Sequence, residues 1–408
     1  ALTEVHSMLQ RMNELAVQAA NGTNSKDTDR KAIQDEIDQL NTEIDRVAET
    51  TKFNEIYLLK GDDGEKTVNM KAHDAGLKGT LTDNGDGTAT FKMDTLNAGD
   101  TVSIGGKNYT IGGVAADVTD MLTKAGITDA AGNKVTINGK EYTYCENASD
   151  GKTALTNKGY YETAPDAANV ATAKPAYANS AAIAAAKSAT ISVGTKSITT
   201  IDDTKADGID DNDTSVITKQ KAYELAGKEL LAANQIGDTE GNAEVKNGDK
   251  SNLAFDAGDG TFNIKVGQAK VANTLSFSLH VGADADMTNK ITVDIETMNS
   301  ANLGIKGLNV TDKNGSAATY AIDAISDAIS KVSSQRSALG AVQNRLEHTI
   351  DNLDNISENT SSAESRIRDT DMAKEMVNYS KNNILAQAGQ SMLAQANQSN
   401  QGVLSLLQ

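Results

Sequence analysis

Apolar residues recur at helical spacing near the end of the chain, between residues 321 and 357. They are separated by three, four or seven residues, with Arg336 and Gln343 as polar interruptions. This seven-residue repeat gives a helix one narrow apolar stripe, which favours packing against other helices. We therefore predict a helix about 55 Å long with one buried side. The expected core positions are Ile325, Ile329, Val332, Leu339, Leu346, Ile350 and Leu353.

Two more amphipathic helices are predicted at the beginning of the chain, over residues 1–21 and 28–49. Joined by a short turn, they form a helical hairpin, and with the stripe of 321–357 they suffice for a bundle of three or four helices. The first pattern is already present at Ala1, with no capping residue before it. We therefore expect the sequence to begin inside a helix. The core positions expected in the second helix are Ile33, Ile37, Leu40 and Ile44.

The composition changes between residues 61 and 276, where Ala, Gly, Thr, Asp and Asn dominate and alternating patterns replace the heptads. Segments 102–110 and 135–143 each consist of a strand, a tight glycine turn and a strand, which is the signature of a β-hairpin. Segment 191–199 follows the same strand–turn–strand pattern less closely and is a third predicted hairpin. Short helices are expected at 114–126 and 216–235, and an Ala-rich connector at 163–189. The region is predicted to form one or two small, mostly β domains.

The remaining segments complete the predicted organisation. A short strand is expected at 53–59, a returning hairpin at 275–298 and a final helix at 362–397. The fold class is therefore α+β and multidomain: both chain ends form a long antiparallel helical bundle, and a hairpin-rich variable region is inserted between them. We divide the chain into a core segment (1–60), the inserted region (61–276), the hairpin with the long helix (277–360) and a terminal helical segment (361–408).

Charge and composition exclude several classes of function. The net charge of −18 provides no basic surplus for binding nucleic acid. The single cysteine, Cys145, excludes an internal disulfide and a cysteine-based zinc site. No run of about 18 apolar residues exists that could cross a membrane, and the first residues do not resemble a signal peptide.

No motif for catalysis is present. The four histidines are scattered, and no phosphate-binding glycine loop occurs. Segments 83–88 and 256–261 resemble calcium loops, but glycines occupy ligand positions and the closing Glu is missing, so hairpin turns are expected. The acidic stretch 207–213 is expected to be a solvated loop. We predict no enzyme activity, no cofactor and no metal.

Five polar residues and one leucine border the apolar stripes of the first two helices. Considered alone, they form an ordinary solvated helix face. They become informative only together with the resemblance of the chain ends to a known family. The residues are Gln10, Arg11, Glu14, Leu15 and Gln18 on the first helix and Glu36 on the second.

The two ends of the chain resemble bacterial flagellin. The similar segments are 9–25 and 33–54 in the first part, and 337–353, 365–378 and 384–408 in the last part. The resemblance implies a filament subunit for motility, with paired helical ends lining the filament core and a variable middle projecting outward. It also implies that an innermost N-terminal segment is missing here, so helix 362–397 lacks a partner. We expect that helix to be disordered or loosely attached in the free monomer and to become ordered on assembly.

The resemblance also implies partners and a location. Expected partners are further copies of the chain, a flagellar export chaperone, cap and junction proteins, and host Toll-like receptor 5. The expected receptor contacts are Gln10, Arg11, Glu14, Leu15, Gln18 and Glu36. The positions near Asn13 and Leu40 are not basic, unlike in many receptor-active flagellins, so weaker signalling is expected. Export without a cleaved signal implies an extracellular protein of the flagellar filament.

Two alternatives remain at this stage. One is a hook–filament junction protein, which has similar ends; the block 387–397 and the terminal 404–407 favour flagellin. The other is a flagellin whose middle region acts as an adhesin.

Overall fold

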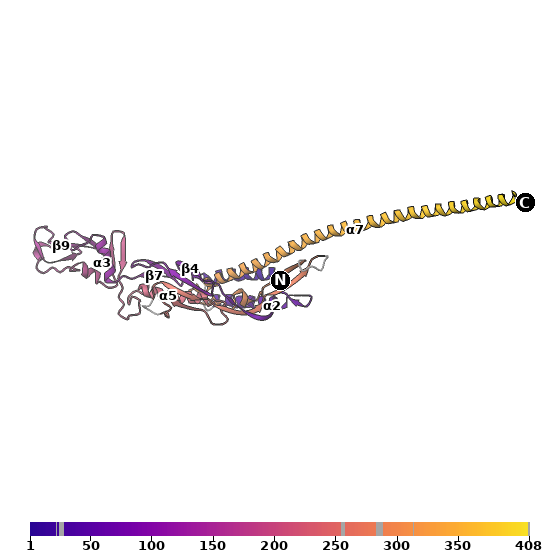
Figure 1. Cartoon of the computed structure of the whole chain (residues 1–408). Helices are drawn as coiled ribbons and strands as arrows, with labels where there is room; N and C mark the ends of the chain where they lie inside the picture. Colours follow the sequence, from indigo (N-terminus) through magenta and orange to yellow (C-terminus); the bar gives the residue numbers. More distant parts are fainter. Residues whose placement is uncertain (22, 24–27, 254–257, 283–288, 313, 407–408) are drawn as a thin grey trace. The chain divides into compact units, whose positions relative to one another are not determined.

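Three long helices come from the two ends of the chain. The computed structural model describes all residues except 22, 24–27, 254–257, 283–288, 313 and 407–408. Helices α1 (Leu2–Ala20) and α2 (Asp29–Thr50) pack against each other as a hairpin, as predicted. The predicted segments 321–357 and 362–397 belong to a single helix, α7 (Ser316–Leu406). No proline and no glycine stands between residues 341 and 388 to end the helix, so it continues through the junction (Figure 1).

The apolar stripes are buried unevenly. The α1 stripe is buried at Val5, Leu9, Met12, Ala16 and Ala19. Among the expected core positions of α2 and α7, Ile33, Ile37, Ile44, Ile325 and Val332 are buried. Others are half-buried, namely Leu40, Ile329, Leu339, Leu346 and Leu353.

Ile350 is a correction to the expected core. It is 56% exposed, so this chain does not bury it. A heptad pattern identifies the side of a helix that is suited to burial, but it does not say how far along the helix a partner extends.

A buried arginine fastens the helices together. Arg30, in the first turn of α2, is 1% exposed. Its Nε donates to the carbonyl of Ala19 at 2.8 Å, its Nη1 to that of Asp312 at 2.9 Å and its Nη2 to that of Asn21 at 3.3 Å. The last carbonyls of a helix have no partner within the helix, and a cation there is favourable. One side chain thus joins the end of α1 to the segment that leads into α7.

The inner part of the inserted region is built on three sheets and one helix. Strands β3 (Asp62–Asn69) and β16 (Gln268–Asn273) pair antiparallel as the chain enters and leaves the region. A four-stranded sheet has the order β14 (Glu244–Asn247), β15 (Thr261–Lys265), β5 (Thr88–Met93) and β4 (Gly79–Asp83), and α5 (Lys219–Asn234) covers it. A three-stranded sheet has the order β13 (Val216–Ile217), β7 (Lys107–Ile111) and β6 (Thr101–Ile104). Phe91 and Phe262 stack in the shared core with ring centroids 6.3 Å apart.

The outer part is a second β domain with its own core. Its five strands lie in the order β10 (Ala154–Tyr161), β9 (Lys140–Asn147), β8 (Lys134–Ile137), β11 (Thr190–Val193) and β12 (Lys196–Thr199). Helices α3 (Ala115–Lys124) and α4 (Ser180–Ala184) pack together, and residues from both enter the core that this sheet forms. A 3-10 turn, η1 (Ala167–Asn169), lies in the Ala-rich connector. Tyr144 and Tyr160 meet edge to face in this core, 5.1 Å between centroids.

The predicted hairpins and short helices are confirmed. Pairs β6–β7, β8–β9 and β11–β12 occupy the three glycine-turn repeats, and α3 and α5 occupy the two predicted helical segments. The predicted single strand at 53–59 is wrong. It is a tight hairpin of β1 (Lys52–Phe53) and β2 (Ile56–Tyr57), because Asn54 and Glu55 both adopt positive φ and reverse the chain.

The chain divides into two compact units. The first comprises residues 1–276 and 294–336, and includes α1, α2, the start of α7, α6 (Ser300–Leu303) and the inserted region. The second comprises residues 277–293 and 337–408. In the second unit, the returning ribbon of β17 (Leu275–His280) and β18 (Lys290–Ile295) lies against the α7 stretch from Arg345 to Ile356.

Candidate assembly and receptor surfaces

The C-terminal part of α7, from Ile367 to Leu404, is an exposed helix that is rich in large apolar side chains. Between 55% and 73% of each of these residues is exposed. Exposed apolar residues scattered singly are normal on a protein surface, but a continuous series marks an interaction site. They are Ile367, Met372, Met376, Val377, Tyr379, Ile384, Leu385, Met392, Leu393, Val403 and Leu404. We call this stretch the distal helix.

The distal helix carries almost no charge toward its end. No Asp, Glu, Lys, Arg or His follows Lys381 in the sequence, whereas Gln, Asn and Ser are frequent. Uncharged amides and hydroxyls can be buried at much lower cost than ions, provided that they find hydrogen-bond partners. The surface chemistry is therefore that of a helix suited to close contact with other protein.

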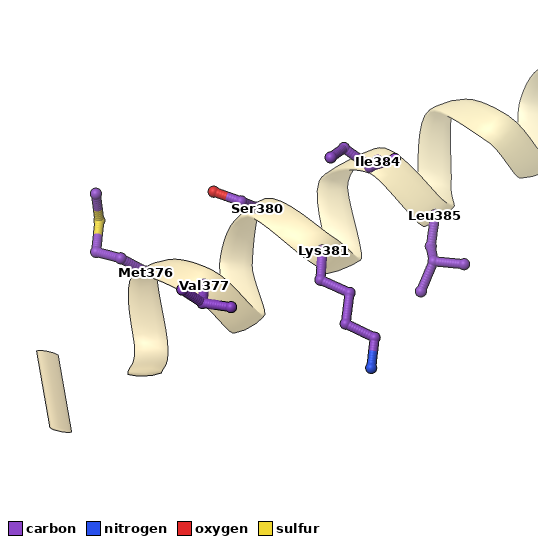
Figure 2. Close-up of a pocket in the computed structure, with 6 residues that line it drawn as sticks. All are labelled: Met376, Val377, Ser380, Lys381, Ile384 and Leu385. Atoms are coloured by element: carbon purple, nitrogen blue, oxygen red, sulfur yellow. The ribbon is translucent and has the colours of Figure 1, made fainter. Parts of the chain in front are cut away.

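The apolar side chains point in several directions. Figure 2 shows Met376, Ser380 and Ile384 on one side of the helix, and Lys381 and Leu385 on the other; these residues line a shallow groove. Adjacent residues such as Ile384 and Leu385 point about 100° apart on a helix with 3.6 residues per turn. A helix that is apolar on more than one side is suited to being surrounded by neighbours.

A second surface lies on α1 and α2, where the predicted receptor residues meet. Arg11 Nε donates to Glu36 Oε1 at 2.8 Å, and Arg11 Nη1 to Glu14 Oε2 at 3.3 Å. The hydrogen bond that Arg11 donates to Glu36 contributes most to raising the pKa of Arg11. Gln10 and Gln18 are exposed on the same helix. Since the three charged side chains are largely exposed, this network orients Arg11 more than it stabilises the fold.

Leu15 does not fit the predicted receptor surface. It is only 2% exposed, so its side chain belongs to the buried face of α1. Val17, which the sequence reasoning missed, is instead the exposed apolar residue near Glu14 and Gln18. On an amphipathic helix, positions at the edge of the stripe are buried or exposed depending on the partner helix, and the pattern alone does not decide between them.

The structure bears on the calcium-like loops, metal sites and membrane spans that were considered from the sequence. Segment 83–88 is the turn between β4 and β5, whereas residues 256 and 257 of the second glycine loop lie outside the described residues. Within the described part of the chain, no group of three or more His, Cys, Asp or Glu is arranged to hold a metal ion. No helix among the residues described is long and apolar enough to cross a membrane.

Comparisons with known proteins agree with the paired helical ends. The bacterial flagellin N-terminal helical region matches residues 1–63, and the bacterial flagellin C-terminal helical region matches residues 322–407. A flagellin of Clostridium tyrobutyricum is 34% identical, with 98% of this chain and 79% of the relative covered. Polar flagellin A of Vibrio parahaemolyticus is 30% identical, with 100% and 78% covered. A flagellin of Bacillus subtilis is 50% identical over 36% of this chain and 54% of its own length.

The matches at both helical ends and over nearly the whole chain define a structural protein that builds filaments, and not an enzyme. The inserted β region is carried between the two helical ends that the family descriptions match. The chain belongs to the bacterial flagellin family.

Proposed function

We propose that subunits of this flagellin join through the distal helix, with neighbouring copies covering its apolar sides in the flagellar filament. The observation that carries this proposal is the continuous exposure of large apolar side chains on a helix without charge after Lys381. Burying one Ile or Leu contributes about 1.5–3 kcal/mol, and each 1.4 kcal/mol changes an association constant tenfold. A contact of this kind, repeated without closure, produces a helical filament.

The test is polymerisation of purified protein onto filament fragments of the same flagellin. The double variant Ile384→Ser with Leu385→Ser is expected to raise the critical concentration at least about tenfold. The matched control is Asn382→Ser with Asn383→Ser, the adjacent pair on the same helix, which should assemble like the unmodified chain. Equal critical concentrations for all three proteins would contradict the proposal.

We further propose that Toll-like receptor 5 contacts the α1–α2 surface through Gln10, Arg11, Glu14, Gln18 and Glu36. The support is their position on adjacent rigid helices and the fixed orientation of the Arg11 guanidinium. An oriented arginine is a frequent hot spot, because its fork of donors is already placed when the partner arrives. Leu15 supports this surface from beneath.

Arg11→Ala is expected to weaken binding to the receptor ectodomain about tenfold or more. Arg46→Ala is the matched control, because Arg46 is also an exposed arginine paired with a glutamate three residues away, Glu43. Binding is measured by surface plasmon resonance and signalling by a reporter cell line. The unmodified chain is expected to bind the receptor but to signal more weakly than flagellins with basic residues near the positions of Asn13 and Leu40. Equal affinity of the two variants would exclude Arg11 as a contact.

The remaining partners follow from the same proposal. Export chaperone, cap and junction proteins are proposed to bind the helical ends before and during assembly, and the assembled protein is extracellular. Electron microscopy of the assembled protein separates a filament subunit from a hook–filament junction protein. Long filaments support the first, and short rings or no growth support the second.

A further inference from the structure

An exposed apolar hairpin lies directly after α2. Strands β1 and β2 pair with Lys52 opposite Tyr57 and Phe53 opposite Ile56. Phe53 is 74% exposed, Ile56 49% and Tyr57 44%. Directly opposite residues of an antiparallel pair share one face, so Phe53 and Ile56 form a single apolar patch. We call these strands and their turn the apolar hairpin.

The apolar hairpin is held in a conformation that its sequence does not favour. Asn54 and Glu55 form a two-residue turn with φ of 47° and 70°. Two left-handed residues in succession define a turn that normally takes Asn-Gly, and a glutamate in the second place is strained. An unconstrained chain would relax this turn. Residues 52–57 are all exposed, so the pairing of the two strands and the bonds at the base of the hairpin are what hold this turn.

The base of the hairpin is anchored on both sides. The amide of Thr51 donates to the carbonyl of Val47 in the last turn of α2 at 3.1 Å, and the amide of Leu58 donates back to Thr51 at 3.0 Å. Leu59 is buried, and its carbonyl accepts from the amide of Met298 at 2.9 Å. A two-stranded hairpin alone is marginally stable, so these bonds make it a fixed projection.

We infer that the apolar hairpin docks onto a second copy of this chain during filament growth. This inference rests on the proposed assembly function but names a contact separate from the distal helix. Two features favour another copy as the occupant. Lys52 and Lys60 flank the apolar side chains, and Glu55 in the turn is the one acid between them, so residues 52–60 have a net charge of +1, whereas each copy carries a net charge of −18. Lys60 Nζ lies 5.5 Å from the centroid of the Tyr57 ring. An open filament also requires a projecting surface that fits a different site on the next copy.

The contact is consistent with a monomer that stays dispersed until growth begins. A patch of two or three side chains buries far less area than a stable pair of proteins needs. It therefore contributes only when several contacts form together at a filament end. A small projection of this kind would add to the specificity of subunit addition without causing pairing in solution.

The experiment combines two measurements on the whole chain. Phe53→Ser with Ile56→Ser is compared with the unmodified protein in polymerisation onto filament fragments, and circular dichroism checks that the variant is folded. Val114→Ser serves as the control, since Val114 is a similarly exposed apolar residue on the outer domain. The hairpin variant is expected to raise the critical concentration about tenfold or more, and the control is expected to leave it unchanged.

The second measurement is hydroxyl-radical footprinting of the unmodified protein, which decides the question even if the variant fails to fold. Phe53 and Tyr57 are expected to be oxidised in the monomer and protected in the filament. Growth of the unmodified chain with full oxidation of Phe53 in the filament would overturn the inference and leave the assembly function intact. That result would assign the hairpin to another partner. Failure of the unmodified chain to polymerise would count against the assembly function itself, and the inference would fall with it.

Discussion

Replacing Arg30 by methionine tests whether one buried side chain holds the helical ends together. Methionine has a similar length and fills much of the same space, but it cannot donate to the carbonyls of Ala19, Asn21 and Asp312. A hydrogen bond from a charged group contributes about 1.5–3 kcal/mol, and a buried acceptor left without a donor adds a cost of its own. Removing the guanidinium also removes its desolvation cost, which offsets part of the loss.

The net destabilisation expected for Arg30→Met is about 2–4 kcal/mol. The two bonds at 2.8 and 2.9 Å account for most of it, because the third, at 3.3 Å, is long and weaker. Against a total stability of about 5–15 kcal/mol for a domain, this is a large fraction. The stability of Arg30→Lys is expected to lie between those of the unmodified chain and Arg30→Met, since a lysine is a single point donor and cannot bridge three carbonyls.

Hydrogen exchange of the α1 amides, followed by mass spectrometry, is the direct assay, because it reports on this part of a multidomain chain. Exchange in α1 is expected to accelerate at least about tenfold in Arg30→Met, which corresponds to about 1.4 kcal/mol. Exchange in the outer β domain should not change. Arg46→Met, which removes an exposed arginine from the same helix, is the control. Unchanged exchange of α1 in Arg30→Met would refute the reasoning.

Three further results are expected. Gly61→Ala should lower the midpoint of urea unfolding and cost about 2 kcal/mol, because φ is +89° and an added Cβ would lie 2.4 Å from Thr297 Oγ1. The pKa of Asp211 is lowered to about 2, chiefly by the hydrogen bond that Lys205 donates to it. The ionised Asp211 therefore stabilises the fold above the ordinary pKa of 3.8, and this contribution is lost as the pH falls toward 2. NMR titration of the surrounding loop should show this loss. Burial raises the pKa of the Cys145 thiol, so alkylation should be slow in the folded protein and fast in urea at the same pH.

The elements with local signals were predictable from the sequence. The heptad patterns predicted where the helices lie, because apolar residues at this spacing fall on one face only if the segment is helical. Glycine turns between alternating residues located the three hairpins because few other residues accept the required φ. These signals act within a few residues, so they can be read without knowing the fold.

Features that depend on distant partners were not predictable. Arg30 is charged and would be expected at the surface; it is buried because α1 and the segment before α7 supply its acceptors. Leu15 is buried and Ile350 exposed, the reverse of what was expected, because partner elements cover one and not the other. The turn at Asn54 and Glu55 has a glutamate where such a turn normally has a glycine, so the usual sequence signal for it was missing.

The pairing of β3 with β16 has a consequence for the size of the inserted region. Asn69 lies opposite Gln268, and the amide of Met70 donates to the carbonyl of Gly267 at 2.8 Å, so the two ends of the insert are one strand spacing apart, about 5 Å. The entropy of closing a loop grows only slowly with its length. A short turn, or an unrelated domain whose own termini lie close together, could therefore replace residues 70–267 while the terminal helices keep their positions. The β3–β16 pair therefore makes residues 70–267 an exchangeable part of the chain, and it offers a defined place to display foreign protein on a filament.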